Sequence, residues 1–206
     1  MKKRHLLWST VLTCWLIISA AGGEVPLGSQ PCAGLTNATI LIIRHAEKPS
    51  TGVELNPTGV LRAKAYVGYF KSFQIEGQPL TLAHIFCTAD SKGSHRPRLT
   101  VTPLGEALQL PLDSRYKNKD APLLAQEIRA QPHGQHLLIC WHHGEIPTLL
   151  NALGEDPQRV LPHGEWPDEV FGWLIELHYD GAGRLQEAKC LNEHLMPDDQ
   201  TVPKLP

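Results

Sequence analysis

The chain has 206 residues, of which 42% are hydrophobic and 19% are charged, so it can bury a core and is not a disordered acidic or basic tract. This length suits one domain, or one domain with a short appendage. Nineteen basic and 21 acidic residues give a formal charge of −2, which argues against a nucleic-acid-binding domain. The 11 histidines are the unusual feature, because histidine serves where protons, phosphates or metal ions are handled.

The first 21 residues have the pattern of a secretory signal peptide. Basic residues at positions 2–4 precede an apolar stretch over positions 6–21, and Gly22 and Gly23 follow it. We expect cleavage after Ala21 and export to the periplasm or the medium, with an uncleaved membrane anchor as the alternative. The processed chain would hold 16 basic and 21 acidic residues, a net charge of −5, and no further segment as long as a membrane span.

Four of the five cysteines lie beyond the predicted signal peptide. Cys87 and Cys140 fall within apolar runs, which predicts that both are free and buried. Cys32 and Cys190 lie near the two ends of the processed chain. An exported location permits disulfides, so a Cys32–Cys190 bond is one pairing that the sequence leaves open.

Strands and helices alternate along most of the chain. Continuous apolar runs, which are typical of strands buried on both faces of a sheet, occur at residues 39–43, 82–87 and 137–141. Proline, capping and periodicity signals predict helices that start at Asn56–Pro57, at Pro103 and at Asp120–Pro122, and a last one over 147–153 that Gly154 ends. In the first of these helices, Arg62 falls on a face other than the apolar one.

This alternation predicts a three-layer α/β/α sandwich with a mainly parallel central sheet. Segments 170–179 and 184–191, joined by a Gly-Ala-Gly turn, predict a C-terminal β-hairpin. A lead-in segment over 22–38 precedes the domain. The proline-rich tail over 196–206 has no periodicity, so we expect it to lie loose on the surface.

Arginines and histidines follow all three predicted parallel strands. Arg44 and His45 follow the first strand, Arg96 and Arg98 come after a loop behind the second, and two histidines at 142–143 follow the third. Ligands of such sheets bind beyond the carboxyl ends of the strands, so these side chains are expected at one edge. Guanidinium groups pair with phosphoryl oxygens, and a neutral imidazole can attack phosphorus. The pattern predicts a site for a small phosphorylated substrate.

Two segments near the first strand resemble the histidine phosphatase superfamily, whose fold is called phosphoglycerate-mutase-like. The run LIIRHAEKP at 41–49 resembles the family signature, an Arg-His-Gly triplet at the end of the first strand, with Ala46 in place of the glycine. The run LNPTG at 55–59 is similar to the start of the family's next helix. Together with two later segments, the resemblance implies a histidine phosphatase domain over 39–195.

The later segments carry the second arginine and the second histidine of the family. The run SHRPRLT at 94–100 resembles the arginine segment, in which the arginine stands four residues before a threonine, and this spacing selects Arg96 over Arg98. The run CWHHGEIP at 140–147 resembles the histidine segment, in which an isoleucine follows the histidine by four residues. That spacing selects His142.

The resemblance implies a phosphomonoester hydrolase that works through a phosphohistidine intermediate. His45 would be the nucleophile, and Arg44, Arg96 and His142 would bind the phosphoryl oxygens, with His142 also taking part in catalysis. Water would then hydrolyse the intermediate. The resemblance implies no metal ion and no organic cofactor, so we expect a metal-independent enzyme of the histidine acid phosphatase type.

The motifs do not identify the residue that protonates the leaving oxygen. Glu145 and His143 are equal candidates, because both follow the second histidine closely. Glu47, on what we expect to be a solvated lip of the pocket, comes after them. Asp113 and Asp120 lie in the short stretch behind the second arginine but match no motif.

Two other functions stay open at this point. The pocket could bind phosphate without turnover, as in a sensor domain. His142, His143 and Glu145 could instead hold a metal ion in a metal-dependent hydrolase, although they lack the two histidines four residues apart of a helical zinc motif.

The sequence does not identify the leaving group of the substrate. We expect the loops at 49–55, 91–95 and 162–170 to surround it. Trp166 and Phe171 are expected to pack in the core.

Overall fold

The computed structural model describes residues 33–199 and residue 201. The predicted signal peptide, most of the lead-in segment, Cys32 and the end of the tail lie outside these residues, so the Cys32–Cys190 bond stays a prediction. Within the described part, no helix is both long enough and apolar enough to cross a membrane. Cys87 and Cys140 are free and buried, as predicted.

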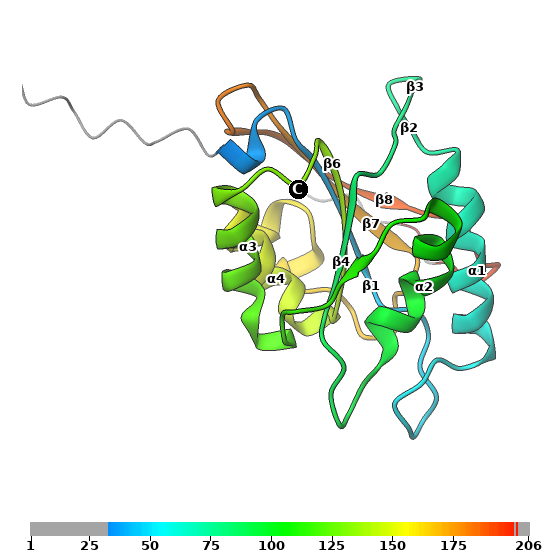
Figure 1. Ribbon diagram of the computed structural model, residues 1–206. Coiled ribbons are helices and arrows are strands. Elements are labelled where there is room, and N and C mark those ends of the chain that lie inside the picture. The colour runs from blue at the N-terminus through cyan, green and yellow to red at the C-terminus, as the bar shows by residue number, and fades with distance from the viewer. Residues whose placement is uncertain (1–32, 200, 202–206) are drawn as a thin grey trace, which may run out of the picture. The chain divides into compact units, whose positions relative to one another are not determined.

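A six-stranded sheet lies between two pairs of helices (Figure 1). Its strands are β1 (Thr39–Arg44), β4 (His84–Cys87), β5 (Leu112–Asp113), β6 (His136–Trp141), β7 (Trp173–Tyr179) and β8 (Leu185–Asn192). The helices are α1 (Pro57–Lys71), α2 (Arg96–Leu108), α3 (Ala121–Ala130) and α4 (Ile146–Leu153). The short strands β2 (Gln74–Ile75) and β3 (Gln78–Pro79) form a separate hairpin. Single turns of 3₁₀ helix are η1 (Ala33–Leu35), η2 (Asn118–Asp120), η3 (His143–Glu145), η4 (Pro157–Arg159) and η5 (Pro162–Gly164).

The central part of the sheet is parallel, as predicted. The strand order is β5-β4-β6-β1-β7-β8, in which the first four strands run parallel and β7 and β8 form an antiparallel hairpin at the other edge. β1 and β6 pair so that Arg44 lies opposite Trp141. The next residues along the two strands, His45 and His142, therefore leave the sheet side by side.

The sheet has a separate core on each face. Side chains alternate between the two faces of a strand, so Ile40 and Ile42 pack with α3 and α4, whereas Leu41 and Ile43 pack with α1 and α2. All four side chains are fully buried, which accounts for the unbroken aliphatic run. The predicted three-layer α/β/α sandwich is thus confirmed (Figure 1).

Helix α1 begins where predicted and approaches the loop behind β1 closely. Asn56 caps the helix by accepting a hydrogen bond from the Gly59 N–H at 2.8 Å, and Pro57 takes the first position. A Cβ atom on Gly59 would lie 2.4 Å from the carbonyl oxygen of Glu47. The missing side chain therefore lets α1 pack against the backbone just after His45.

Helix α2 begins at Arg96, earlier than the predicted start at Pro103. Proline is favoured in a first turn, and Pro97 takes that place, while Pro103 lies inside the helix. The Ser94 hydroxyl accepts a hydrogen bond from the Arg96 N–H at 3.2 Å. Arg96 is consequently held at the start of a helix and not in a loop.

The sequence interpretation is wrong for Arg62, for Glu47 and for residues 196–199 of the tail, because these parts meet in one cluster of charges. Arg62 is 2% exposed, and its guanidinium pairs with Glu47 at 2.7 Å, Glu193 at 3.3 Å and Asp199 at 2.5 Å. Glu47 is therefore not on a solvated lip, and the tail is fixed as far as Asp199. Glu193 and Asp199 lie 131 and 137 residues after Arg62 in the chain, so the local sequence around Arg62 does not indicate that it has these partners.

Glu193 is the most deeply buried acid of this cluster. Burial raises its pKa to about 8, even though Arg62 and the Tyr66 hydroxyl both donate hydrogen bonds to it. The folded protein therefore keeps a proton on this carboxyl group that the unfolded chain loses near its ordinary pKa.

We expect the Glu193 proton to contribute a decrease in the free energy of unfolding as pH rises from 6.5 to 8. In this range the folded chain still holds the Glu193 proton and the unfolded chain does not, so each pH unit lowers stability by roughly 1 kcal/mol. Histidines whose pKa is lowered in the folded chain, such as His45 and His142, add a slope of opposite sign near pH 6.5, and the wild-type protein shares it with Glu193→Gln. Glu193→Gln, which imitates the neutral acid, should therefore gain stability relative to the wild-type protein as pH rises in urea denaturation, and a difference between the two proteins that does not change with pH would contradict the assignment.

Candidate active site

The parallel pairing of β1 and β6 brings the two predicted catalytic histidines together. The His45 N–H donates to the Trp141 carbonyl at 2.9 Å, which continues the ladder one step beyond β1. The imidazole rings of His45 and His142 lie edge to face, with centroids 5.0 Å apart. Both side chains thus stand at the carboxyl edge of the parallel strands, where ligands of such sheets bind.

His45 is held as a neutral imidazole. Its Nδ1 lies 2.7 Å from the Ala46 carbonyl oxygen, so Nδ1 carries the proton and Nε2 keeps its lone pair. The ring is buried, and burial together with the charges of Arg44 and Arg96 lowers its pKa to about 2. At neutral pH this side chain is therefore a nucleophile that needs no deprotonation.

Arg44 is a fully buried cation that backbone oxygens stabilise. Its Nη1 donates to the carbonyl groups of Pro167, Asp168 and Val170 at 3.1, 2.9 and 2.8 Å. Its Cζ lies 3.9 Å from the centre of the Phe171 ring, a cation–π contact. Burial lowers its pKa to about 10, which leaves the guanidinium charged at neutral pH.

His143 joins Arg44 to the loop behind η5. Its Nδ1 lies 3.1 Å from Arg44 Nη2, which can only donate, so Nδ1 accepts and the ring proton sits on Nε2. That Nε2 lies 2.6 Å from the Asp168 carboxylate. Burial and the Arg44 charge lower the pKa of His143.

Arg96 reaches the same site from the start of α2. Its Nη1 donates to the Gly52 carbonyl at 3.1 Å. Thr100 ties this turn of α2 to the loop behind β1, because its hydroxyl donates to the Arg96 carbonyl at 2.8 Å and accepts from the Ala46 N–H at 2.9 Å. Arg98, by contrast, turns to the surface and pairs with Asp90 at 2.7 Å.

The site has buried donors that an anion would satisfy. The Nε atoms of Arg44 and Arg96 are both buried, and neither has an acceptor among the described residues. Unpaired buried donors are costly, and a phosphoryl group presents several oxygens to such forks. Burial and the charges of Arg96, His143 and Arg44 also lower the pKa of His142 to about 4. This arrangement fits a bound oxyanion.

The carboxylates that sequence reasoning considered as proton donors lie in different surroundings. Glu145 pairs with Lys119 at 3.2 Å, and Glu47 is held by Arg62. Asp113 pairs with Arg115 at 2.8 Å. Asp120 accepts a hydrogen bond from the backbone at the start of η2. Of all the candidates, His143 is the one in direct contact with Arg44.

The three residues of the metal-site alternative do not form a set of ligands. Among the described residues, no group of three or more His, Cys, Asp or Glu side chains could hold a metal ion. His142, His143 and Glu145 all lie within the described part of the chain.

Sequence reasoning missed the part of the site that the chain supplies after η5. Trp166 packs in the core as expected, but Phe171 lies over Arg44, and its ring centre is 6.3 Å from that of His45. Asp168 was not identified either, although the segment 162–170 was expected near the substrate. The sequence offered little indication of this role, because the loop binds Arg44 mainly through backbone carbonyl groups, which are present whatever the side chains are.

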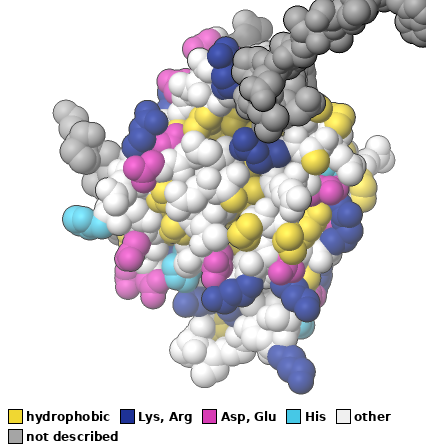
Figure 2. All heavy atoms as spheres, turned by 90° about the vertical axis from the view of Figure 1, so that its left-hand side faces the viewer, with side chains coloured by type: hydrophobic (Ala, Val, Ile, Leu, Met, Phe, Trp, Pro, Cys, Tyr) yellow, Lys and Arg dark blue, Asp and Glu magenta, His cyan; other side chains and the backbone are white. Residues whose placement is uncertain are grey.

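Charged side chains of both signs are scattered over the face formed by α3 and α4 (Figure 2). Several lysines and arginines gather at the lower end of this view, the end at which the parallel strands finish in Figure 1. Carboxylates lie beside them in the same view, so this end of the surface carries both signs of charge (Figure 2).

The fold also resembles solved structures. No protein-family profile matches the chain, and no curated protein is significantly similar to it in sequence. The protein histidine phosphatase SixA, solved with tungstate, superposes with a TM-score of 0.53 at 16% identity, over 73% of this chain and 95% of that one. A phosphoglycerate mutase from Plasmodium falciparum gives a TM-score of 0.48 at 14% identity, over 74% of this chain and 90% of that one.

The likeness to the protein histidine phosphatase shows a shared fold. The chain thus has the phosphoglycerate-mutase-like architecture of the histidine phosphatases, as the resemblance of its motifs implied. On that architecture, Arg44, His45, Arg96 and His142 converge at one edge of the sheet.

We expect inorganic phosphate to raise the thermal unfolding midpoint of the wild-type protein. A ligand at 100 times its dissociation constant adds about 2.7 kcal/mol to the stability of the folded state. Arg96→Gln should lose most of this gain, because it removes one of the two buried unpaired Nε–H groups. Arg98→Gln is the matched control and should keep it. Scans at equal ionic strength in sodium chloride supply the baseline, and an equal loss in both variants would refute the assignment.

Proposed function

We propose that the protein is a phosphomonoesterase that forms a phosphohistidine on His45. One observation carries the proposal: a neutral imidazole with a free Nε2 lies beside two arginines whose buried Nε–H groups have no acceptor. The cations neutralise the phosphoryl oxygens, and the nucleophile itself carries no charge that has to be removed. A small phosphorylated compound is the substrate, and the shared fold supports the same class of reaction.

The reaction has two steps. In the first, Nε2 of His45 attacks phosphorus, the bond between phosphorus and the ester oxygen breaks, and the leaving alcohol takes up a proton. Arg44, Arg96 and His142 bind the phosphoryl oxygens and stabilise the transition-state charge. In the second step, the group that protonated the alcohol takes a proton from water, the water oxygen attacks phosphorus, the bond from nitrogen to phosphorus breaks, and inorganic phosphate is released. These groups suffice without a metal ion, and the signal-like N-terminus supports an exported enzyme.

His143 is the proton donor in this proposal. Of the candidates, it alone contacts Arg44 directly, and its Nε2 also faces the exposed Asp168 carboxylate. The phosphate dianion of the substrate favours the imidazolium form of the ring, in which Nδ1 also carries a proton and gives it to the ester oxygen in place of accepting from Arg44. Glu145 is less well placed, because its carboxylate pairs with Lys119.

His45→Ala should lower kcat/KM for p-nitrophenyl phosphate at least about a thousandfold, because it removes the atom that attacks phosphorus. His136→Ala, at the opposite end of β6, is the control and should retain activity.

Wild-type turnover should persist in EDTA, and a quenched reaction should contain acid-labile phosphate bound to the protein. A chelator effect that zinc reverses would favour a metal-dependent hydrolase. Tight phosphate binding without any turnover would favour a sensor domain.

His143→Gln tests the proton donor through the leaving group. Loss of a general acid should lower kcat/KM for phenyl phosphate at least about tenfold more than for p-nitrophenyl phosphate, whose leaving group needs less protonation. A disturbance of Arg44 alone would lower both values equally. Glu145→Gln is the matched variant, and a change of the ratio in Glu145→Gln but not in His143→Gln would assign the role to Glu145.

A further inference from the structure

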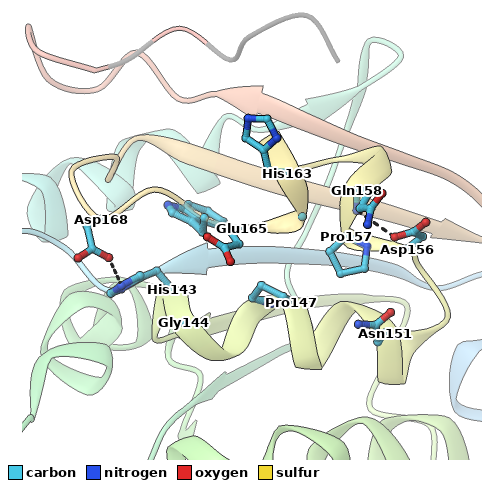
Figure 3. Close-up of a pocket in the computed structure, with 12 residues that line it drawn as sticks. His143, Gly144, Pro147, Asn151, Asp156, Pro157, Gln158, His163, Glu165 and Asp168 are labelled. Carbon is cyan, nitrogen blue, oxygen red and sulfur yellow. Dashed lines mark hydrogen bonds and ion pairs between the residues drawn. The ribbon is translucent and has the colours of Figure 1, made fainter. Parts of the chain in front are cut away.

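A groove borders the candidate active site on the side of α4 (Figure 3). Its volume of about 660 Å³ lies in the range of small-molecule sites. Pro147 and Asn151 of α4 form one wall, and the segment from Asp156 to Asp168 forms the other.

Two residues at one end of the groove contact Arg44. His143 and Asp168 lie at that end, where their ion pair is drawn in Figure 3. Both also contact Arg44, His143 through its Nδ1 and Asp168 through its carbonyl oxygen. If His143 protonates the ester oxygen, as proposed above, the leaving group of a phosphate on Arg44 lies at this end of the groove and extends along α4.

The lining of the groove is acidic and polar. Asp156, Glu165 and Asp168 supply carboxylates, and no lysine or arginine lines the cavity. The Glu165 carboxylate and the Asn151 amide have no hydrogen-bond or ion-pair partner among the described residues. Carboxylates accept hydrogen bonds from hydroxyl and ammonium groups and repel anions. The exposed Lys48 acts on His142 and His143 but does not line the groove.

A second cavity on the other side of the site has similar chemistry. Its lining includes the carboxylates of Glu169 and Asp198, apolar side chains, and Arg62 with its partners Glu47 and Asp199. An additional anionic group on the substrate would thus meet carboxylates on either side of the cationic centre.

We propose that the groove along α4 is the leaving-group subsite, and that it selects phosphomonoesters whose leaving group carries hydroxyl or amino groups and no second negative charge. The proposal rests on the phosphatase function proposed above and specifies its substrate class. Glu165 is the specificity-determining residue, because its unpaired carboxylate faces the groove (Figure 3).

Three probes with one six-carbon skeleton and the phosphate on the same carbon test this charge preference. They are glucosamine 6-phosphate, glucose 6-phosphate and 6-phosphogluconate, whose leaving groups are cationic, neutral and anionic. We expect kcat/KM of the wild-type protein for the first two to exceed that for the third at least about tenfold. Glu165→Lys should lower the ratio of glucosamine 6-phosphate to 6-phosphogluconate by about tenfold or more, since it reverses the charge beside the leaving group.

Glu106→Lys makes the same charge change on an exposed part of α2 outside the groove and should leave the ratio unchanged. Turnover of p-nitrophenyl phosphate distinguishes failure of the leaving-group subsite from failure of the phosphatase function. If the wild-type protein hydrolyses it but treats the three probes alike, prefers 6-phosphogluconate or accepts none of them, the subsite is refuted and the phosphatase stands. An unchanged ratio in Glu165→Lys refutes the subsite as well. If p-nitrophenyl phosphate is not hydrolysed, the proposed function fails, and the subsite fails with it.

Discussion

The site depends on a buried guanidinium that no carboxylate neutralises by a hydrogen bond. Among the described residues, Arg44 donates to three carbonyl groups and one imidazole, so its charge is stabilised by dipoles and not cancelled. A carboxylate bonded to it would have competed with phosphate for the same donors. Carbonyl dipoles hold the cation in place and leave its positive potential for the ligand and for the neighbouring imidazoles.

The protonation state of His45 follows from that potential. Burial disfavours the charged ring, and Arg44, His142 and Arg96 add to the effect, so the group that would attack phosphorus is neutral without a base. The same potential attracts the substrate. Phosphate binding and activation of the nucleophile therefore have one physical origin, and a substitution that removes an arginine affects both.

Acidic residues surround this positive centre. The groove along α4 and the cavity beside α1 are both lined by carboxylates, and the Arg62 cluster consumes the one arginine that lines either cavity. The positive charge of the protein is thus concentrated around the phosphoryl group and does not extend along the rest of the substrate. Specificity for the phosphate and selection against a second anion then come from separate parts of one surface.

Sequence patterns were sufficient to predict the strands and the start of α1, because buried parallel strands and helix caps have strong local patterns. The aliphatic run of β1 and the Asn56–Pro57 cap are examples. The strand ends in turn predicted the edge of the sheet that carries His45 and His142. The start of α2 was misplaced, because Pro97 and Pro103 give the same local signal. The surroundings of the two buried arginines were not predictable, since they arise from tertiary contacts between segments far apart in the chain. Examples are the carbonyl groups and the Phe171 ring that contact Arg44, and the acidic partners of Arg62.

The Arg62 cluster also constrains the order in which the molecule can be completed. Glu47 precedes Arg62 in the chain, but Glu193 and Asp199 are synthesised 131 and 137 residues after it. The cluster can therefore be complete only after synthesis has passed Asp199, and a chain that ends before Glu193 leaves Arg62 with Glu47 as its one partner of the three.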